Sequence, residues 1–247
     1  MSKNWDAFAI TMDPNSQRFK SFQQNNSHIG FDIFQAVNGQ TLDFNELVRN
    51  GLISEELSSS PLLTKGTAGC AESHRSLWRK SVEENINLLI LEDDCYTHKS
   101  LTNFIDARLQ MLTSIDICLF GVNTDVDFHS VSPQGLASIT NFMPKYPKEE
   151  WIMNALERTN PREVRFHKLL RGAGFCAYFI TPEGARKMLA AIFPLSLESK
   201  EPYKRILPFS IDRSASKVYR HIPAAVCQPF MAFSPNTDSS TIQRANS

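Results

Sequence analysis

Short apolar runs alternate with amphipathic segments along most of the chain, and this alternation predicts its secondary structure. Runs rich in aliphatic and aromatic residues predict strands, and segments whose apolar positions recur every three or four residues predict helices. The expected strands cover residues 5–12, 31–37, 88–91, 115–122 and 175–180, and the expected helices cover residues 13–22, 66–81, 101–112, 148–158 and 182–192. The regular alternation favours an α/β fold with a mixed, mostly parallel sheet flanked by helices.

Three segments lack such a pattern. Residues 135–147 are expected to be irregular because proline interrupts them, and residues 158–171 carry six basic side chains, which is typical of a solvated face. The polar segment 234–247 is expected to be a disordered tail that follows a single domain over residues 1–233.

The first two expected strands and the helix between them form a β-α-β unit, which places ligands at its strand ends. Asp13-Pro14 has the N-cap and first-turn chemistry that starts a helix. Asp13, Arg18, Asn38 and Gly39 would then lie near the rim of the sheet. A helix cap, a surface charge and a turn would explain the same residues. Without a glycine-rich phosphate loop, this unit alone favours the structural explanation.

One face of the expected helix at 66–81 collects six residues at intervals of three and four. They are Cys70, Ser73, His74, Leu77, Trp78 and Ser81. His74 therefore points inward beside Trp78. A single histidine on such a face is more often a core residue than a ligand. This helix leads directly into a strand that ends in acidic residues, however, and that favours a position beside the same cleft.

The apolar run 88–91 ends in three adjacent carboxylates, Glu92, Asp93 and Asp94. Strands that are buried on both faces have continuous aliphatic sequences, and ligands of open α/β sheets gather beyond the carboxyl ends of such strands. Three neighbouring carboxylates repel one another, so a cation or several donor groups must offset their charge. A divalent metal ion is the natural partner.

Composition narrows the classes of function. The 247 residues are 42% hydrophobic and 21% charged, which suits a soluble globular domain. No apolar run approaches the ~20 residues that cross a bilayer. The N-terminus lacks the features of a secretory signal, so a cytoplasmic location is expected. The five cysteines stand singly and are expected to be reduced.

The charges balance overall but not along the chain. Lys and Arg number 26, as do Asp and Glu, so no net positive charge attracts nucleic acid. Residues 1–125 nevertheless hold 10 basic against 16 acidic side chains, and residues 126–247 hold 16 against 10. An acidic, metal-holding half would then face a basic half that receives phosphates. The alternative is that solvated faces happen to segregate.

Two motifs resemble the pattern of glycosyltransferase family 25. Gly69-Cys70-x-x-Ser73-His74 is similar to the family's Gly-Cys-x-x-Ser-His helix, and Ile90-Leu91-Glu92-Asp93-Asp94 is similar to the strand end that follows it. Further similarity lies in residues 9–13 with Arg18, and in residues 36–39, 174–186 and 210–212. The resemblance spans residues 5–230, and the family includes lipopolysaccharide-type galactosyltransferases and their collagen-modifying relatives.

The resemblance implies a GT-A-like, Rossmann-like domain that transfers a hexose with inversion at the anomeric carbon. The expected donor is a UDP-sugar, with UDP-galactose first, and the expected acceptor is a glycan such as a lipooligosaccharide. Mn²⁺ or Mg²⁺ held by carboxylates would stabilise the departing diphosphate. Asp94 is the first expected metal ligand, and Glu92, on the same face of an extended chain, is the second. Asp93 would then point the other way.

The resemblance also assigns roles to individual residues. The nucleotide sugar is expected to contact Asp13, Arg18, Asn38, Gly39, Ser73, His74, Glu92 and Asp93. The expected catalytic base is Asp212, with Asp125 and Asp127 as alternatives at another strand end.

Acceptors of this kind are lipid-linked, so the basic half is expected to contact the inner face of a membrane peripherally. Two other classes of function also fit the acidic strand end. One is a metal-dependent phosphohydrolase, and the other is a non-catalytic protein that binds nucleotide sugars or glycans.

Overall fold

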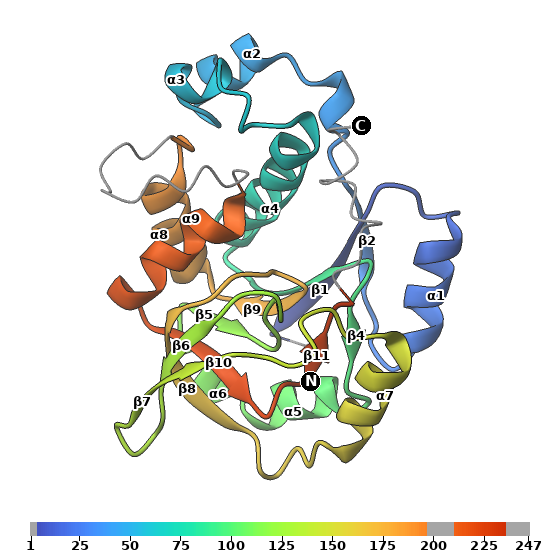
Figure 1. Cartoon of the computed structure of the whole chain (residues 1–247). Coiled ribbons are helices and arrows are strands. Elements are labelled where there is room, and N and C mark those ends of the chain that lie inside the picture. The colour runs from blue at the N-terminus through green and yellow to red at the C-terminus, as the bar shows by residue number, and fades with distance from the viewer. Residues whose placement is uncertain (1–3, 197–209, 236–247) are drawn as a thin grey trace.

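The computed structural model describes residues 4–196 and 210–235 of the chain, which form a nine-stranded mixed sheet with helices on both faces (Figure 1). The strand order is β2-β1-β3-β9-β5-β10-β8-β6-β7, and β4 and β11 form a separate pair. The strands are β1 (Trp5–Thr11), β2 (Asp32–Gln35), β3 (Asn87–Glu92), β4 (Tyr96–Thr97), β5 (Ile117–Leu119), β6 (Phe128–Val131), β7 (Ala137–Thr140), β8 (Arg165–Arg171), β9 (Ala177–Ile180), β10 (Ala224–Gln228) and β11 (Ala232–Phe233).

The helices divide between the two faces of the sheet. The longest, α4, lies with α8 and α9 on one face, and α1, α5 and α6 cover the other. The helices are α1 (Gln17–Asn25), η1 (Gly39–Thr41), α2 (Phe44–Arg49), α3 (Glu55–Ser58), α4 (Lys65–Glu84), α5 (Leu101–Ala107), α6 (Leu109–Leu112), α7 (Glu149–Arg158), α8 (Pro182–Ile192), α9 (Ile211–Val218) and η2 (Tyr219–His221).

Six of the nine strands (β1, β2, β3, β5, β6 and β10) run in one direction, which confirms the expected mixed, mostly parallel sheet. β1 is parallel to both neighbours, β2 and β3, and β5 is parallel to β10. β9 lies antiparallel between β3 and β5, and β8 lies antiparallel between β10 and β6. β7 closes the edge antiparallel to β6. The carboxyl ends of β1 and β3 therefore lie side by side, where ligands of α/β sheets bind.

Alternate residues of β3 face two hydrophobic cores, one on each side of the sheet. Leu88 and Ile90 belong to the core under α4 and α8, whereas Leu89 and Leu91 belong to the core under α1 and α5. All four side chains are fully buried, as the continuous apolar run predicts. The alternation places the next side chain, Glu92, on the α4 side of the sheet.

The expectation for residues 135–147 and 158–171 was wrong in part. Residues 137–140 form the edge strand β7, whose side chains are mostly exposed and therefore lack an apolar alternation. The basic stretch contains β8, which pairs with β10 and β6. Its charged side chains reach solvent while its backbone is paired, and Leu169 is its one fully buried side chain.

The first helix begins later than Asp13-Pro14 predicts. Ser16 caps α1, because its Oγ accepts a hydrogen bond from the Phe19 N–H over 3.1 Å. Asp13 instead holds the preceding turn by accepting from the Asn15 N–H over 2.8 Å. A start at residue 17 puts the buried rings of Phe19 and Phe22 on the face toward the sheet.

Within the described residues, no helix combines the length and the apolar character that a bilayer span requires. Residues 236–247 of the expected tail lie outside the described residues.

Candidate active site

The carboxyl ends of β1 and β3 bring three acids together. β3 ends at Glu92, and the N–H of Cys95 donates to the Glu92 carbonyl over 3.0 Å, which closes a tight turn through Asp93 and Asp94. The expectation that Asp93 points away from Asp94 assumed an extended chain, and the turn makes it wrong. Both aspartates contact the same arginine, Arg18 of α1.

Arg18 supplies a positive charge to this cluster. Its Nη2 lies 2.6 Å from Oδ1 of Asp93 and 3.5 Å from Oδ2 of Asp94. The Thr11 hydroxyl donates to the other oxygen of Asp93 over 2.7 Å. Asp93 therefore has a partner on each oxygen. Part of the charge that a metal ion was expected to offset is already offset by an arginine and a hydroxyl.

Asp94 is left with an unused oxygen. Its Oδ1 is buried and has no hydrogen-bond partner among the described residues, although its side chain as a whole is 24% exposed. Burial, and after it the charge of Glu92, raises the pKa of Asp94 to about 6. A buried carboxylate oxygen without a partner, close to a second carboxylate, suits a hard divalent cation. Asp94 and Glu92 thus fit the expected Mn²⁺ or Mg²⁺.

A cavity of about 150 Å³ opens beside Asp94. It is lined by Arg18, Ser21, Phe22, Asn25, Asp93, Asp94, Cys95, Tyr96 and Pro235. Acidic, cationic, amide and aromatic side chains therefore meet in one small space beside the acids.

Glu92 faces α4, and its carboxylate contacts His74 of that helix. Nε2 of His74 lies 3.2 Å from Oε1 of Glu92, and Nδ1 of His74 lies 2.8 Å from the hydroxyl of Tyr178. The indole N–H of Trp78 donates to the same hydroxyl over 2.8 Å. His74 is only 1% exposed, so it acts on the site through Glu92 and not by touching a ligand.

Cys70 is a member of this group that the sequence interpretation did not use. The ligand atoms of Cys70, His74 and Glu92 lie within 4.8 Å of one another, a spacing that could hold a thiophilic metal ion. Burial, followed by the charges of Glu92, Asp212 and Asp94, raises the pKa of the Cys70 thiol well above its usual value. Thiolates suit soft metal ions, whereas Mn²⁺ and Mg²⁺ prefer oxygen ligands. For the expected ion the carboxylates are therefore the better ligands.

Asp212 joins the site from the first turn of α9. Its Oδ2 accepts the N–H of Gly174 over 2.9 Å, and its Oδ1 accepts the N–H of Arg213 over 2.9 Å and the Ser210 hydroxyl. Gly174 has a φ of +100°, and a Cβ at this position would lie 2.3 Å from Oδ1 of Asn123. Only glycine fits such a turn, and its N–H is one of the groups that hold the Asp212 carboxylate.

The charges place Asp212 with the acid cluster. Asp212, Glu92 and Asp94 all contribute to the raised pKa of Cys70, after burial. Burial, and then the charge of Asp212 among its neighbours, also raises the pKa of Asp125, whose buried Oδ1 has no partner within the described part of the chain. Asp125 therefore remains an alternative base.

Asp127, the other alternative base, is exposed, and it accepts a hydrogen bond from the Asn141 amide over 2.6 Å at the base of the β6–β7 hairpin. Its charge is not among those that shift the pKa values of Cys70, Asp94 and Asp125. Its role as a base stays a prediction.

Ser73 has a structural role. It is 1% exposed, accepts the N–H of Val37 over 2.9 Å and donates to the Gly69 carbonyl over 2.8 Å. The hydrogen bond from Val37 connects the segment after β2 to α4. The hydroxyl hydrogen is used by Gly69, and contact of Ser73 with the nucleotide sugar stays a prediction.

Three other residues that were expected to contact the nucleotide sugar lie in a turn or at the start of η1. Asn38 is exposed and accepts the N–H of Gln40 over 3.0 Å, and Asp13 is exposed in the turn before α1. Gly39 is buried, and a Cβ there would lie 1.8 Å from the Lys65 carbonyl. Glycine thus permits the loop to approach the start of α4. Contact of these three residues with a nucleotide sugar stays a prediction.

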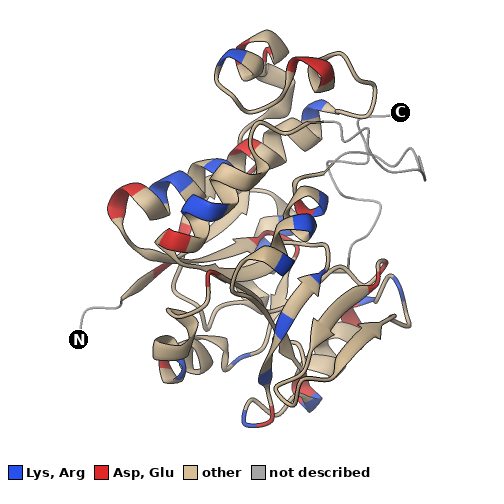
Figure 2. Cartoon of the chain, turned by 90° about the vertical axis from the view of Figure 1, so that its left-hand side faces the viewer, with Lys and Arg blue, Asp and Glu red and all other residues tan. Residues whose placement is uncertain are grey.

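The contacts of the site do not show the expected pairing of the acidic residues 1–125 with the basic residues 126–247. In the parts of the chain that the structure describes, the cation paired with Asp93 and Asp94 is Arg18 of the acidic half, not the basic stretch 158–171. Figure 2 shows both signs of charge interspersed along the helices of one face.

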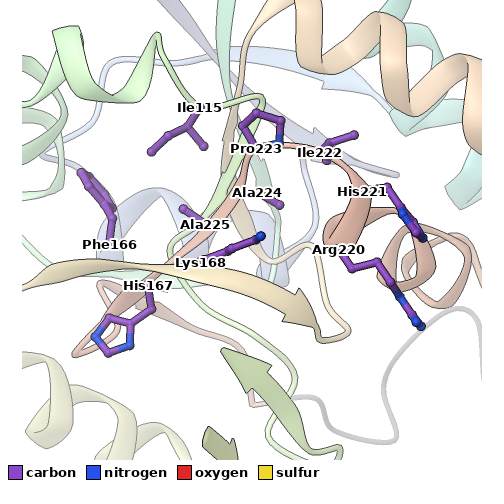
Figure 3. Close-up of a pocket in the computed structure, with 10 residues that line it drawn as sticks. All are labelled: Ile115, Phe166, His167, Lys168, Arg220, His221, Ile222, Pro223, Ala224 and Ala225. Atoms are coloured by element: carbon purple, nitrogen blue, oxygen red, sulfur yellow. The ribbon is translucent and has the colours of Figure 1, made fainter. Parts of the chain in front are cut away.

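A larger cavity of about 460 Å³ lies near the starts of β5 and β10, at the opposite end of the sheet from the acids. Its wall is apolar around Ile115 and Phe166. Figure 3 shows His167 on one side and Arg220 on the other, pointing away from each other. The carboxylates of β3 lie at the other end of the sheet, so this cavity is not part of the candidate active site.

A family model described as glycosyltransferase family 25 (LPS biosynthesis protein) matches residues 5–201. A search of curated proteins finds no match. The matched segment contains Arg18, His74 and the acids of β3, while Asp212 lies beyond its end. The assignment of Asp212 therefore depends on its geometry.

Proposed function

The chain belongs to glycosyltransferase family 25, a family of lipopolysaccharide biosynthesis, and we propose that it transfers a hexose from a UDP-sugar to a surface glycan in a metal-dependent, inverting reaction. Galactose is the first candidate for the sugar, and a lipooligosaccharide or another glycolipid is the first candidate for the acceptor. The GT-A-like arrangement of the nucleotide-sugar site is part of the same proposal.

The observation that carries the proposal is the buried, unpartnered oxygen of Asp94 beside Glu92, at the joint carboxyl end of β1 and β3. A bound Mn²⁺ or Mg²⁺ would neutralise the charge that grows on the leaving diphosphate. Glu92 and Asp94 would hold the ion. Arg18 forms an ion pair with Asp93, and it lines the cavity beside which the anionic nucleotide sugar would lie.

Inversion requires a base that takes the proton of the acceptor hydroxyl while this hydroxyl attacks opposite the diphosphate. We assign that role to Asp212. Its charge acts on Cys70 together with those of Glu92 and Asp94, whereas the charges that act on Asp125 come from Asp212, Arg213 and Lys145. The charge of Asp212 thus acts on the same thiol as the charges of the acid cluster. Its bonds to Gly174 and Arg213 hold it in one orientation, which is what a base must have.

A thermal-shift screen tests the proposal. The full chain is mixed with UDP-galactose, UDP-glucose or UDP-N-acetylglucosamine, each with Mn²⁺ or with chelator. We expect one UDP-hexose to raise the melting temperature in Mn²⁺ and to have no effect in chelator. Stabilisation of equal size in chelator would contradict the metal assignment.

Two further measurements separate the alternative functions. Release of phosphate from simple phosphate esters, without sugar transfer, would instead indicate a phosphohydrolase. Donor binding by calorimetry, with neither transfer nor slow donor hydrolysis, would indicate a non-catalytic binder. Transfer to a glycan acceptor with inverted anomeric configuration supports the proposal directly.

A further inference from the structure

Three buried side chains behind Glu92 form a chain of hydrogen bonds. The indole N–H of Trp78 donates to the Tyr178 hydroxyl over 2.8 Å, this hydroxyl lies 2.8 Å from Nδ1 of His74, and Nε2 of His74 lies 3.2 Å from Oε1 of Glu92. Trp78 and Tyr178 are fully buried, and His74 nearly so. The hydrophobic core is thereby linked to a carboxylate of the site.

The count of hydrogens decides which nitrogen of His74 is protonated. An indole N–H can only donate, so it uses one acceptor position of the Tyr178 oxygen. The phenol hydrogen then needs an acceptor, and among the described residues the one within reach is Nδ1 of His74. The opposite arrangement would leave a buried phenol hydrogen unpaired, which opposes folding. Neutral His74 therefore carries its hydrogen on Nε2 and donates it to Glu92.

Packing holds these groups in place. The ring of Phe175 lies 5.1 Å from that of His74, 4.9 Å from that of Tyr178 and 5.9 Å from that of Trp78, measured between centroids. Burial raises the pKa of Tyr178 well above its usual value, so its hydroxyl keeps the hydrogen that it donates. Neither the rings nor the hydroxyl can turn to another partner without disturbing the core.

We propose that Tyr178 and Trp78 are positioning residues for Glu92, because they fix the Nε2–H tautomer of His74 and thereby anchor one oxygen of the Glu92 carboxylate. The other oxygen has no hydrogen-bond partner in the described parts of the chain, and the Glu92 side chain is 32% exposed. It is therefore available to a ligand. That this ligand is the metal ion of a nucleotide-sugar complex rests on the proposed function, whereas the tautomer does not.

The variant that tests this inference is Tyr178→Phe, which removes the hydroxyl and keeps the ring. Tyr219→Phe is a matched control. Tyr219 is also fully buried, and its hydroxyl has no hydrogen-bond partner in residues 4–196 and 210–235, so the same chemical change removes no bond there. Both variants are made in the full chain, and circular dichroism checks that each is folded.

Nitrogen NMR of histidine-labelled protein gives the first readout, because a ring nitrogen that carries hydrogen resonates far from one that does not. The signal of His74 is assigned by its loss in His74→Gln. We expect an Nε2–H tautomer in the wild type and in Tyr219→Phe, and a mixture of tautomers in Tyr178→Phe. An Nδ1–H tautomer in the wild type would overturn the inference, whatever the protein catalyses.

The second readout is the affinity for Mn²⁺ in the presence of the UDP-sugar that the thermal screen identifies. Loss of a group that orients a ligand residue typically costs 10- to 100-fold in metal affinity or activity, and we expect Tyr178→Phe to fall in this range. Tyr219→Phe should stay within about twofold of the wild type, since it removes no hydrogen bond. Equal affinities for the two variants would also overturn the inference.

A double variant separates positioning from general damage. The side-chain amide of Gln donates a hydrogen whether or not Tyr178 is present, so in the His74→Gln background Tyr178→Phe should change Mn²⁺ affinity by less than about twofold. A loss as large as in the wild-type background would contradict the route through His74. If Tyr178→Phe fails to fold, Trp78→Phe tests the same series of hydrogen bonds, and we expect the same mixture of tautomers in that variant. If the wild type binds no Mn²⁺, the proposed function fails, and the NMR result still decides the tautomer.

Discussion

Replacement of Asp94 by asparagine should stabilise the metal-free protein and abolish transfer. Asparagine has the shape of aspartate and can still accept the hydrogen bond that Ser234 makes with Asp94, but it carries no charge. Burial, and then the charge of Glu92, raises the pKa of Asp94 from its ordinary 3.8 to about 6. At neutral pH the ionised carboxylate therefore opposes folding, and the neutral amide does not.

The sign and the size follow from the two pKa values. The unfolded chain loses the Asp94 proton near pH 3.8 and the folded chain near pH 6, so between these values the folded state binds more protons and stability falls as the pH rises. The full difference corresponds to about 3 kcal/mol. Solvent screens part of it, since 24% of the side chain is exposed. We expect about 1–2 kcal/mol, or a rise in Tm of about 2–8 °C for a chain of this size.

The assay is thermal unfolding in chelator at pH 7 and at pH 4, for the wild type and Asp94→Asn. The rise in Tm of Asp94→Asn over the wild type should be present at pH 7 and nearly absent at pH 4, where Asp94 is protonated in the folded wild type. Asp127→Asn is the control, because Asp127 is exposed and its charge is not among those that shift the pKa of Asp94, and its Tm should change by the equivalent of at most ~0.5 kcal/mol. An Asp94→Asn protein that is less stable than the wild type at pH 7 would refute the electrostatic account, and one that transfers sugar at the normal rate would refute the metal assignment.

Three further predictions concern other parts of the site. Asp212→Asn should lower the kcat of transfer by about 10²–10⁴-fold and leave donor binding by calorimetry unchanged, whereas a larger loss in Asp125→Asn would move the role of base to Asp125. Gly174→Ala should cost about 2–4 kcal/mol of unfolding free energy, because its φ is +100° and the new Cβ would lie 2.3 Å from Asn123 Oδ1. Gly30→Ala, where a Cβ would meet nothing within 4 Å, serves as its control in chemical denaturation. Arg18→Gln should lower the Tm of the metal-free protein by removing the charge beside Asp93 and Asp94, and Mn²⁺ should recover more of the Tm in this variant than in the wild type. An unchanged Tm would show that Arg18 does not offset these charges.

Two strands in the middle of the sheet were predictable because their sequences are apolar on both faces, whereas no strand was expected at β10, although it is mostly buried, or at β6. β3 and β9 have this character, and both were expected close to their observed bounds. β7 and β8 were not recognised, because an edge strand and a strand with charged side chains on its solvent side lack that signal. Their identity as strands depends on the partners that β6 and β10 provide, and no local pattern contains this information.

The residues of the candidate site likewise divide into those that were predictable from the sequence and those that were not. Glu92–Asp94 and the inward-facing His74 were predictable because each depends on residues close together in the sequence. The pairing of Arg18 with Asp93 was not, because it depends on the turn after Glu92 and on the neighbouring position of β1. Tyr178 was also missed as a partner of His74. A signal existed: a tyrosine in an otherwise apolar buried strand must find a hydrogen-bond partner for its hydroxyl.

The arrangement of charges indicates when a metal ion becomes necessary. Arg18 offsets one of the three carboxylates, and His74 donates to a second, so the chain can fold without a metal ion. The cluster still keeps two negative charges at neutral pH, and a diphosphate brought beside them would be repelled. A chelator should therefore leave the Tm of the free protein almost unchanged and remove the rise in Tm that the donor causes. If the chelator alone lowers the Tm by many degrees, the metal ion is part of the fold, and Arg18 does not offset the acids as inferred here.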